Sequence, residues 1–138
     1  MLLESFDLTI EGIQVHLKLY DPVTVLFDVS GAGKSFICSG VHNYILNHPN
    51  CHYNLLMPES FSLWRAMLGQ ADTLLFIDDI DLLAELYPES IDYINSGEIP
   101  MVVTGRDFSK FKFDYHAYQR LLFDANKKIL TNDPSYLA

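Results

Sequence analysis

Two stretches near the start of the chain alternate strictly between apolar and polar residues. Residues 5–10 place apolar side chains at every second position, and residues 13–19 do the same. A period of two is typical of a strand with one buried face. Glu11 and Gly12, which separate the two stretches, favour a tight turn. The pattern therefore predicts an antiparallel hairpin at the start of the chain.

Four later segments are short and almost continuously apolar, namely residues 23–27, 53–57, 73–77 and 101–104. Strands of a parallel sheet are buried on both faces, so they lack the alternation of a half-buried strand. Helices are expected over residues 36–47, 59–68, 81–95 and 117–123, and a last strand over 128–131. Pro88 is expected to restart a helix at its first position. Strands that alternate with helices predict an α/β fold with a mainly parallel sheet, extended by the N-terminal antiparallel β-hairpin, in a single domain spanning residues 1–138.

Composition excludes several classes of protein. The 138 residues are 49% hydrophobic, which suits one globular domain with its own core. The chain has 18 acidic and 9 basic residues and a net charge of −9, so binding across a broad face of duplex nucleic acid is not expected. No apolar run is long enough to span a membrane, and the start lacks the basic region of a secretory signal. Two cysteines are too few for a disulfide framework, which leads us to expect a cytoplasmic protein.

Charge is distributed unevenly along the chain. Residues 104–130 contain six basic and three acidic residues, whereas the remainder contains three basic and fifteen acidic residues. This basic segment is either a solvated face of an acidic protein or a set of positive groups that converge on an anionic ligand.

The strongest motif is Phe-Asp-Val-Ser-Gly-Ala-Gly-Lys-Ser at residues 27–35, between a predicted strand and a predicted helix. Glycines at 31 and 33 let backbone N–H groups approach a phosphate, and the following helix directs its positive dipole end toward the anion. The segment resembles the Walker A motif of P-loop NTPases, in which Lys34 would reach the β- and γ-phosphates and Ser35 would ligate Mg²⁺. Asp28 stands where this family has its first glycine. A glycine turn that binds nothing is the alternative.

The resemblance implies a three-layer P-loop fold that binds ATP, or less readily GTP, together with Mg²⁺. It covers about residues 23–106. Residues implied to hold the nucleotide are Ser30, Gly31, Ala32, Gly33, Lys34, Ser35 and Phe36. Residues implied to hold the metal are Ser35 and Asp78.

A second motif lies at residues 73–79, where an apolar strand ends in two aspartates. It resembles a Walker B motif, in which Asp78 would hold Mg²⁺ and Asp79 would activate the attacking water. Asp79 replaces the more usual glutamate, which shortens the reach of the carboxylate. An alternative is that Asp78, Asp79 and Asp81 form an acidic cap on the next helix, and the two interpretations are compatible.

A third candidate follows the last buried strand, which ends in Thr104, Gly105 and Arg106. In P-loop ATPases of the additional-strand class, the strand between the two Walker strands ends in a polar sensor, and Thr104 resembles it. Arg106 could meet a γ-phosphate of its own or of a neighbouring subunit. A surface arginine paired with Asp107 or another acid is the equal alternative for Arg106.

His48, Cys51 and His52 are metal-ligand types crowded into one predicted loop, with His42 nearby. A structural zinc site usually needs two pairs of ligands, so turn residues with incidental histidines are the better interpretation.

Two classes of function stay open at this point. The first is an ATP-binding P-loop protein, a possible ATPase whose hydrolysis would be slow without an arginine from a protein partner or a second subunit. The second is a degenerate P-loop domain that acts as an acidic protein-binding or regulatory module without nucleotide turnover. A small-molecule kinase is a third, less favoured possibility, since no substrate pocket can be located from the sequence.

Overall fold

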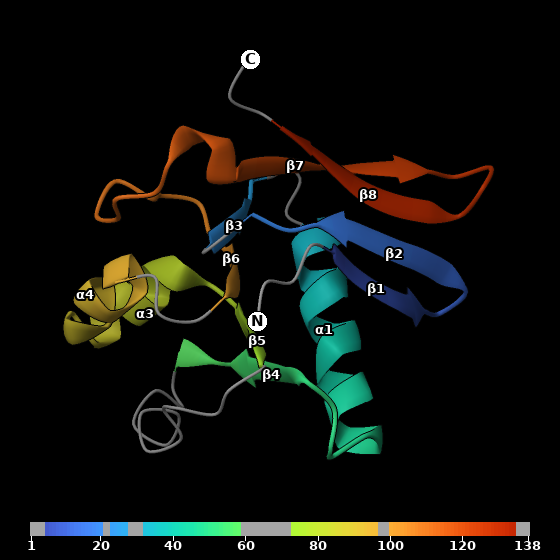
Figure 1. Ribbon diagram of the computed structural model, residues 1–138, viewed down its shortest axis with the longest axis horizontal. Coiled ribbons are helices and arrows are strands. Elements are labelled where there is room, and N and C mark those ends of the chain that lie inside the picture. Colours follow the sequence, from blue (N-terminus) through green and yellow to red (C-terminus); the bar gives the residue numbers. More distant parts are fainter. Residues whose placement is uncertain (1–4, 21–22, 28–31, 59–72, 97–99, 135–138) are drawn as a thin grey trace.

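The computed structural model describes residues 5–20, 23–27, 32–58, 73–96 and 100–134. Eight described strands form one mixed sheet in the order β1-β2-β8-β7-β3-β6-β5-β4 (Figure 1). Helices lie on both sides of it, so the chain has an α/β fold as expected from the sequence.

The predicted N-terminal hairpin is confirmed. Strand β1 (Ser5–Ile10) pairs antiparallel with β2 (Ile13–Lys18). Glu11 and Gly12 form the turn with φ of 51° and 80°, a conformation that glycine adopts without strain. The hairpin adds to the edge of the sheet beside β8.

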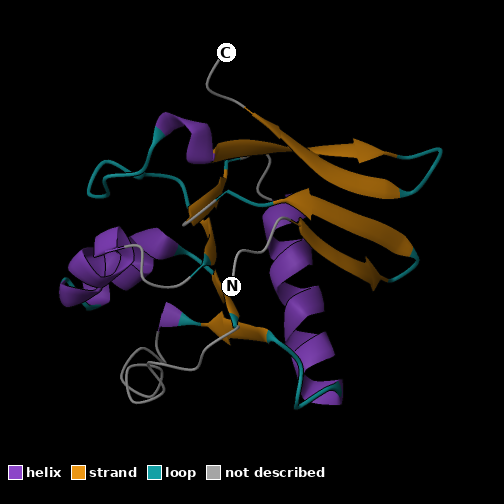
Figure 2. Ribbon diagram, viewed as in Figure 1, coloured by secondary structure: helices purple, strands orange, loops and turns teal. Residues whose placement is uncertain are grey.

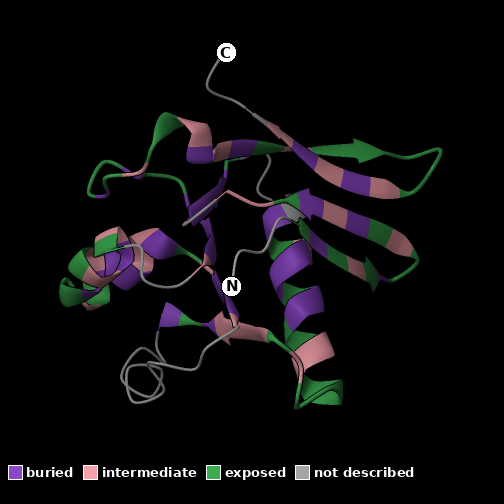
Figure 3. Ribbon diagram, viewed as in Figure 1, coloured by how far each residue is buried: buried purple, intermediate pink, exposed green. Residues whose placement is uncertain are grey.

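Five neighbouring strands form the main parallel part of the sheet, and β2 also pairs in parallel with β8 (Ile129–Pro134). They are β7 (Tyr118–Asp124), β3 (Val23–Leu26), β6 (Met101–Thr104), β5 (Leu74–Ile77) and β4 (Tyr53–Leu56). Every residue of β3, β5 and β6 is buried, which is the physical reason for their continuous apolar sequence (Figure 3). The four strands predicted from such runs are confirmed.

The helices lie on opposite faces of the parallel strands (Figures 1 and 2). Helix α1 (Ala32–Asn47) covers one face, and α3 (Ile80–Leu86) with α4 (Glu89–Ser96) covers the other. Successive residues of β3 belong to different core clusters, Val25 to the one beside α3 and Leu26 to the one beside α1. The core is therefore split by the sheet into two layers.

Three helix predictions have different outcomes. The first predicted helix is confirmed as α1, which ends directly before His48. The prediction for residues 81–95 is confirmed as two helices, and Pro88 immediately precedes the second, α4. The helix expected at residues 59–68 lies outside the described residues.

The predicted helix at residues 117–123 is wrong. A short 3₁₀ helix (Tyr115–Ala117) leads into β7, which pairs in parallel with β3 and antiparallel with β8 (Ile129–Pro134). The local sequence has no strict alternation, and strand pairing on both sides decides the structure. The last strand was predicted, but it extends to Pro134.

A buried side chain joins the hairpin to the rest of the sheet. Asn132 of β8 accepts the Lys18 amide proton at 2.7 Å and donates to the Lys18 carbonyl at 2.9 Å, as a neighbouring strand would. Its amide also donates to the buried Gln119 at 3.1 Å. Within the described part of the chain, no helix combines the length and apolar character that crossing a membrane requires.

Candidate functional site

The carboxyl ends of β3, β5 and β6 meet at one edge of the sheet. These strands are adjacent and parallel, and the register pairs Leu26 with Thr104 and Ile77 with Val103. A cleft of about 430 Å³ opens beside this edge. Its lining residues are Lys34, Ser35, Asp78, Asp79, Asp81, Thr104, Gly105 and Arg106. Six of them were predicted as site residues from three separate motifs, so the fold brings the motifs together.

Lys34 occupies an unusual position at this cleft. It lies in the first turn of α1, where the helix dipole is positive, and only 8% of it is exposed. Its Nζ donates to the Gly105 carbonyl at 3.1 Å, and no described carboxylate lies within ion-pair distance of it. A buried cation is stabilised by a negative charge beside it, so an anion next to Lys34 would be favoured.

The Thr104 hydroxyl connects the two aspartates that follow β5. It donates to Asp78 Oδ1 at 3.2 Å and accepts the backbone N–H of Asp79 at 3.1 Å. Asp78 is half-buried, and its carboxylate is also hydrogen-bonded to the thiol of Cys38. The network holds the Asp78 carboxylate in place at the cleft.

Asp79 is the N-cap of α3. It has φ of 59° and ψ of 71°, and its Oδ1 accepts the Leu82 amide proton at 3.2 Å. Aspartate tolerates this left-handed conformation better than most residues, and the bond satisfies a free amide of the helix. The capping alternative is thus confirmed for Asp79, which still lines the cleft with an exposed side chain.

Asp81 holds the turn that follows β6. Its Oδ2 accepts the backbone N–H of Arg106 at 2.7 Å, and its Oδ1 accepts that of Asp107 at 3.1 Å. Sequence reasoning grouped Asp81 with an acidic cap and assigned it no role in the site. Nothing local in the sequence links it to residues 25 positions away.

Arg106 is exposed at the rim of the cleft. Among the described residues its guanidinium forms no ion pair. The neighbouring Asp107 carboxylate accepts the Ser109 amide proton at 3.0 Å, and this bond lowers the pKa of Asp107. The ion pair between Arg106 and Asp107, considered above, is not formed.

Cys38 lies behind the cleft and was not predicted as a neighbour of the site. It is 4% exposed, and burial raises the pKa of its thiol to about 12, with a further contribution from the Asp78 carboxylate, to which the thiol is hydrogen-bonded. Its spacing of four residues from Lys34 places both side chains on one face of α1, which is the signal that could have identified it.

The remaining predicted site residues are Ser30, Gly31, Ala32, Gly33 and Phe36, and of these the described side chain of Phe36 is not part of the cleft lining. Ser30 and Gly31 lie outside the described residues, while Ala32 and Gly33 are the first residues of α1. Phe36 packs against the core cluster beside α1 and borders a groove next to β1.

The oxygen donors at the cleft suit Mg²⁺. This ion prefers hard oxygen ligands and usually takes one or two carboxylates, several waters and substrate phosphates. The carboxylate of Asp78 and the hydroxyl of the exposed Ser35 are donors of this kind. The described residues contain no group of three or more His, Cys, Asp or Glu side chains placed to hold a metal by themselves, and this includes the loop with His48.

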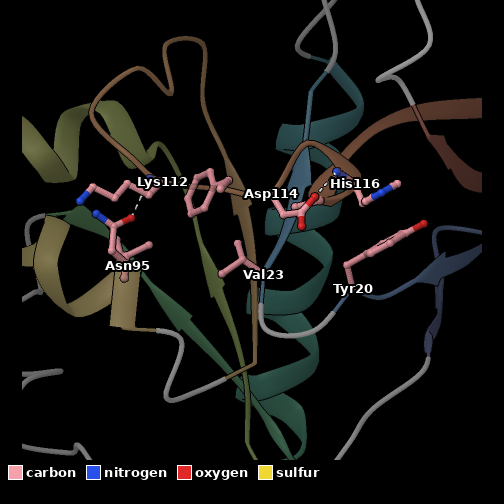
Figure 4. Close-up of a pocket in the computed structure, with 9 residues that line it drawn as sticks. Tyr20, Val23, Asn95, Lys112, Asp114 and His116 are labelled. Atoms are coloured by element: carbon pink, nitrogen blue, oxygen red, sulfur yellow. Dashed lines mark hydrogen bonds between the residues drawn. The ribbon is translucent and has the colours of Figure 1, made fainter.

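A second cavity, of about 270 Å³, lies at the opposite end of β3 (Figure 4). Val23, the first residue of the strand, lies at its floor, with Asn95 and Lys112 on one side and Asp114 on the other. None of the predicted site residues lines it. In parallel α/β sheets ligands bind at the carboxyl ends of strands, which favours the cleft over this cavity.

The chain matches no family model, no curated protein and no solved structure. The residues and geometry of the cleft are therefore the basis on which a function can be assigned.

Proposed function

We propose that the chain binds ATP, or less readily GTP, together with Mg²⁺ at the cleft formed by α1, β5 and β6. The observation that carries this proposal is the buried ammonium of Lys34, which has only the Gly105 carbonyl as a described partner. A polyphosphate would place negative charge beside this ammonium, and Lys34 would contact its β- and γ-phosphates. Ser35 and Asp78 would hold the metal, which neutralises part of the phosphate charge.

The strand order supports the same proposal. Strand β6 lies between β3 and β5, and it ends in Thr104. This agrees with the resemblance to P-loop ATPases of the additional-strand class, in which a polar sensor ends the strand between the two Walker strands. Thr104 would then sense the γ-phosphate.

The acidic lining makes the metal essential. The cleft presents three carboxylates, from Asp78, Asp79 and Asp81, against the cations Lys34 and Arg106. A polyphosphate without Mg²⁺ would be repelled by this surplus of negative charge. Slow hydrolysis is expected, because the Asp79 carboxylate that would position water is already oriented by its bond to α3. A protein partner or a second subunit would be needed to add a further arginine.

Isothermal titration with ATP and Mg²⁺ tests this proposal. The variants are Lys34→Ala and, as a charge-matched control, Lys127→Ala in the exposed turn before β8. We expect Lys34→Ala to weaken binding roughly ten- to a hundred-fold, because it removes charge-assisted bonds to two phosphates. Lys127→Ala should bind like the wild-type chain, and melting curves establish that each variant is folded.

Equal affinity of the wild type and Lys34→Ala, or no binding by either, would refute nucleotide binding at this cleft. The acidic protein-binding module would then be the better hypothesis.

A further inference from the structure

One carboxylate joins helix α3 to the turn that follows β6. Asp81, in the first turn of α3, accepts the amide protons of Arg106 and Asp107, at 2.7 and 3.1 Å. Both of its oxygens are thereby engaged with backbone, so Asp81 is poorly placed to bind a metal or activate water. Its bonds instead fix the turn that follows β6.

The same turn also holds Lys34, the lysine proposed to bind phosphate. The carbonyl of Gly105, immediately before Arg106, accepts the Nζ proton of Lys34 at 3.1 Å. The close packing depends on glycine, because a Cβ on Gly105 would lie 2.8 Å from Ile80 Cγ2 and 2.9 Å from Asp81 Oδ1. A chain of contacts thus runs from Asp81 through the turn to Lys34.

We propose that Asp81 is a positioning residue for the polyphosphate. It holds the Gly105–Asp107 turn so that Lys34 and Arg106 are directed into the cleft. The inference rests on the proposed nucleotide binding. It adds that the selectivity for triphosphate over monophosphate depends on a side chain that touches no phosphate. Lys34 contacts the β- and γ-phosphates, so its displacement penalises ATP and leaves AMP almost unaffected.

The test compares the affinities of ATP and AMP, each with Mg²⁺, by isothermal titration of the full chain. Variants are Asp81→Ala, the isosteric Asp81→Asn, Lys34→Ala, and the control Asp92→Asn, an exposed carboxylate in the first turn of α4. Asp81→Ala should lower the ratio of ATP to AMP affinity about ten-fold, the effect of losing charge-assisted bonds. Asp81→Asn keeps one acceptor oxygen and should lower the ratio less, whereas Asp92→Asn should not change it.

The possible outcomes separate the two proposals. If Lys34→Ala lowers the ratio but Asp81→Ala does not, the role of Asp81 is refuted and nucleotide binding stands. If Asp81→Ala weakens ATP and AMP equally, its role is only structural, and the inference is also refuted. If the wild type does not bind ATP, both proposals fail. Should Asp81→Ala fail to fold, as judged by its melting curve, Asp81→Asn decides between these outcomes.

Discussion

Thr104 shows how much one hydroxyl group determines at this site. Its proton is donated to Asp78, and one of its lone pairs accepts the Asp79 amide proton. A hydroxyl has a single proton, so Thr104 cannot donate to a phosphate while it donates to Asp78. A sensor role would therefore require Thr104 to exchange its bond to Asp78 for a bond to the γ-phosphate, which couples the phosphate to the metal-binding carboxylate.

The buried thiol of Cys38 makes the free energy of unfolding depend on pH. Burial raises the pKa of its thiol from 9.0 to about 12 in the folded chain. Between these values the unfolded chain loses the thiol proton and the folded chain keeps it, so the free energy of unfolding decreases as the pH rises above 9. Without nucleotide or metal, the decrease attributable to Cys38 should approach about 1.4 kcal/mol for each pH unit above 9.

Urea denaturation at pH 8 and pH 10 checks this expectation, with Cys38→Ala as the comparison. The wild type should lose more stability than the variant between the two pH values. Equal losses would mean that Cys38 ionises in the folded chain as readily as in the unfolded chain.

At the scale of elements, the contact between α1 and β1 holds the helix that carries Lys34 and Ser35. Gly40, in the middle of α1, is buried against Ile10 of β1. A Cβ at this position would lie 2.2 Å from Ile10 Cδ1 and 2.6 Å from its Cγ1. Glycine normally destabilises a helix interior, and here it allows the hairpin to pack directly on α1.

Gly40→Ala should therefore reverse the usual effect of this substitution. In an exposed helix it stabilises, but here we expect the free energy of unfolding to fall by about 1–3 kcal/mol, because the added methyl group overpacks the contact with Ile10. The exposed neighbour Ser39 supplies the control, since Ser39→Ala should be neutral or slightly stabilising. Urea denaturation measures both, and a more stable Gly40→Ala would show that α1 and β1 can move apart at little cost.

The β7–β8 hairpin marks the limit of what local sequence predicts. The apolar residues of β7 do not alternate clearly, since Leu121, Leu122 and Phe123 are consecutive. The turn itself had a signal in the sequence, because aspartate is common in turns. In the structure Asp124 accepts the amide protons of Asn126 and Lys127. Pairing with β3 on the other side could not be read from this segment, and it determines that β7 is a strand.

On the scale of the whole molecule, the sequence predicted which residues line the site better than it predicted the hydrogen bonds that join them. The motifs placed Lys34, Asp78 and Thr104 at the ends of separate elements, and parallel strands necessarily bring their carboxyl ends to one edge. The link from Asp81 to the turn after β6 could not be predicted, because it joins a side chain to backbone amides of another element. Such bonds leave no spacing pattern in the sequence.

Among the described residues, one cavity lies at each end of β3, and this contrast allows a direct test of nucleotide binding at the cleft. Backbone amide NMR shifts, recorded during titration with ATP and Mg²⁺, locate the bound nucleotide. We expect the largest changes at Lys34, Ser35, Gly105 and Arg106, which line the cleft at the carboxyl end of β3. Changes confined to Asn95, Lys112 and their neighbours around the other cavity, or no changes at all, would contradict this expectation.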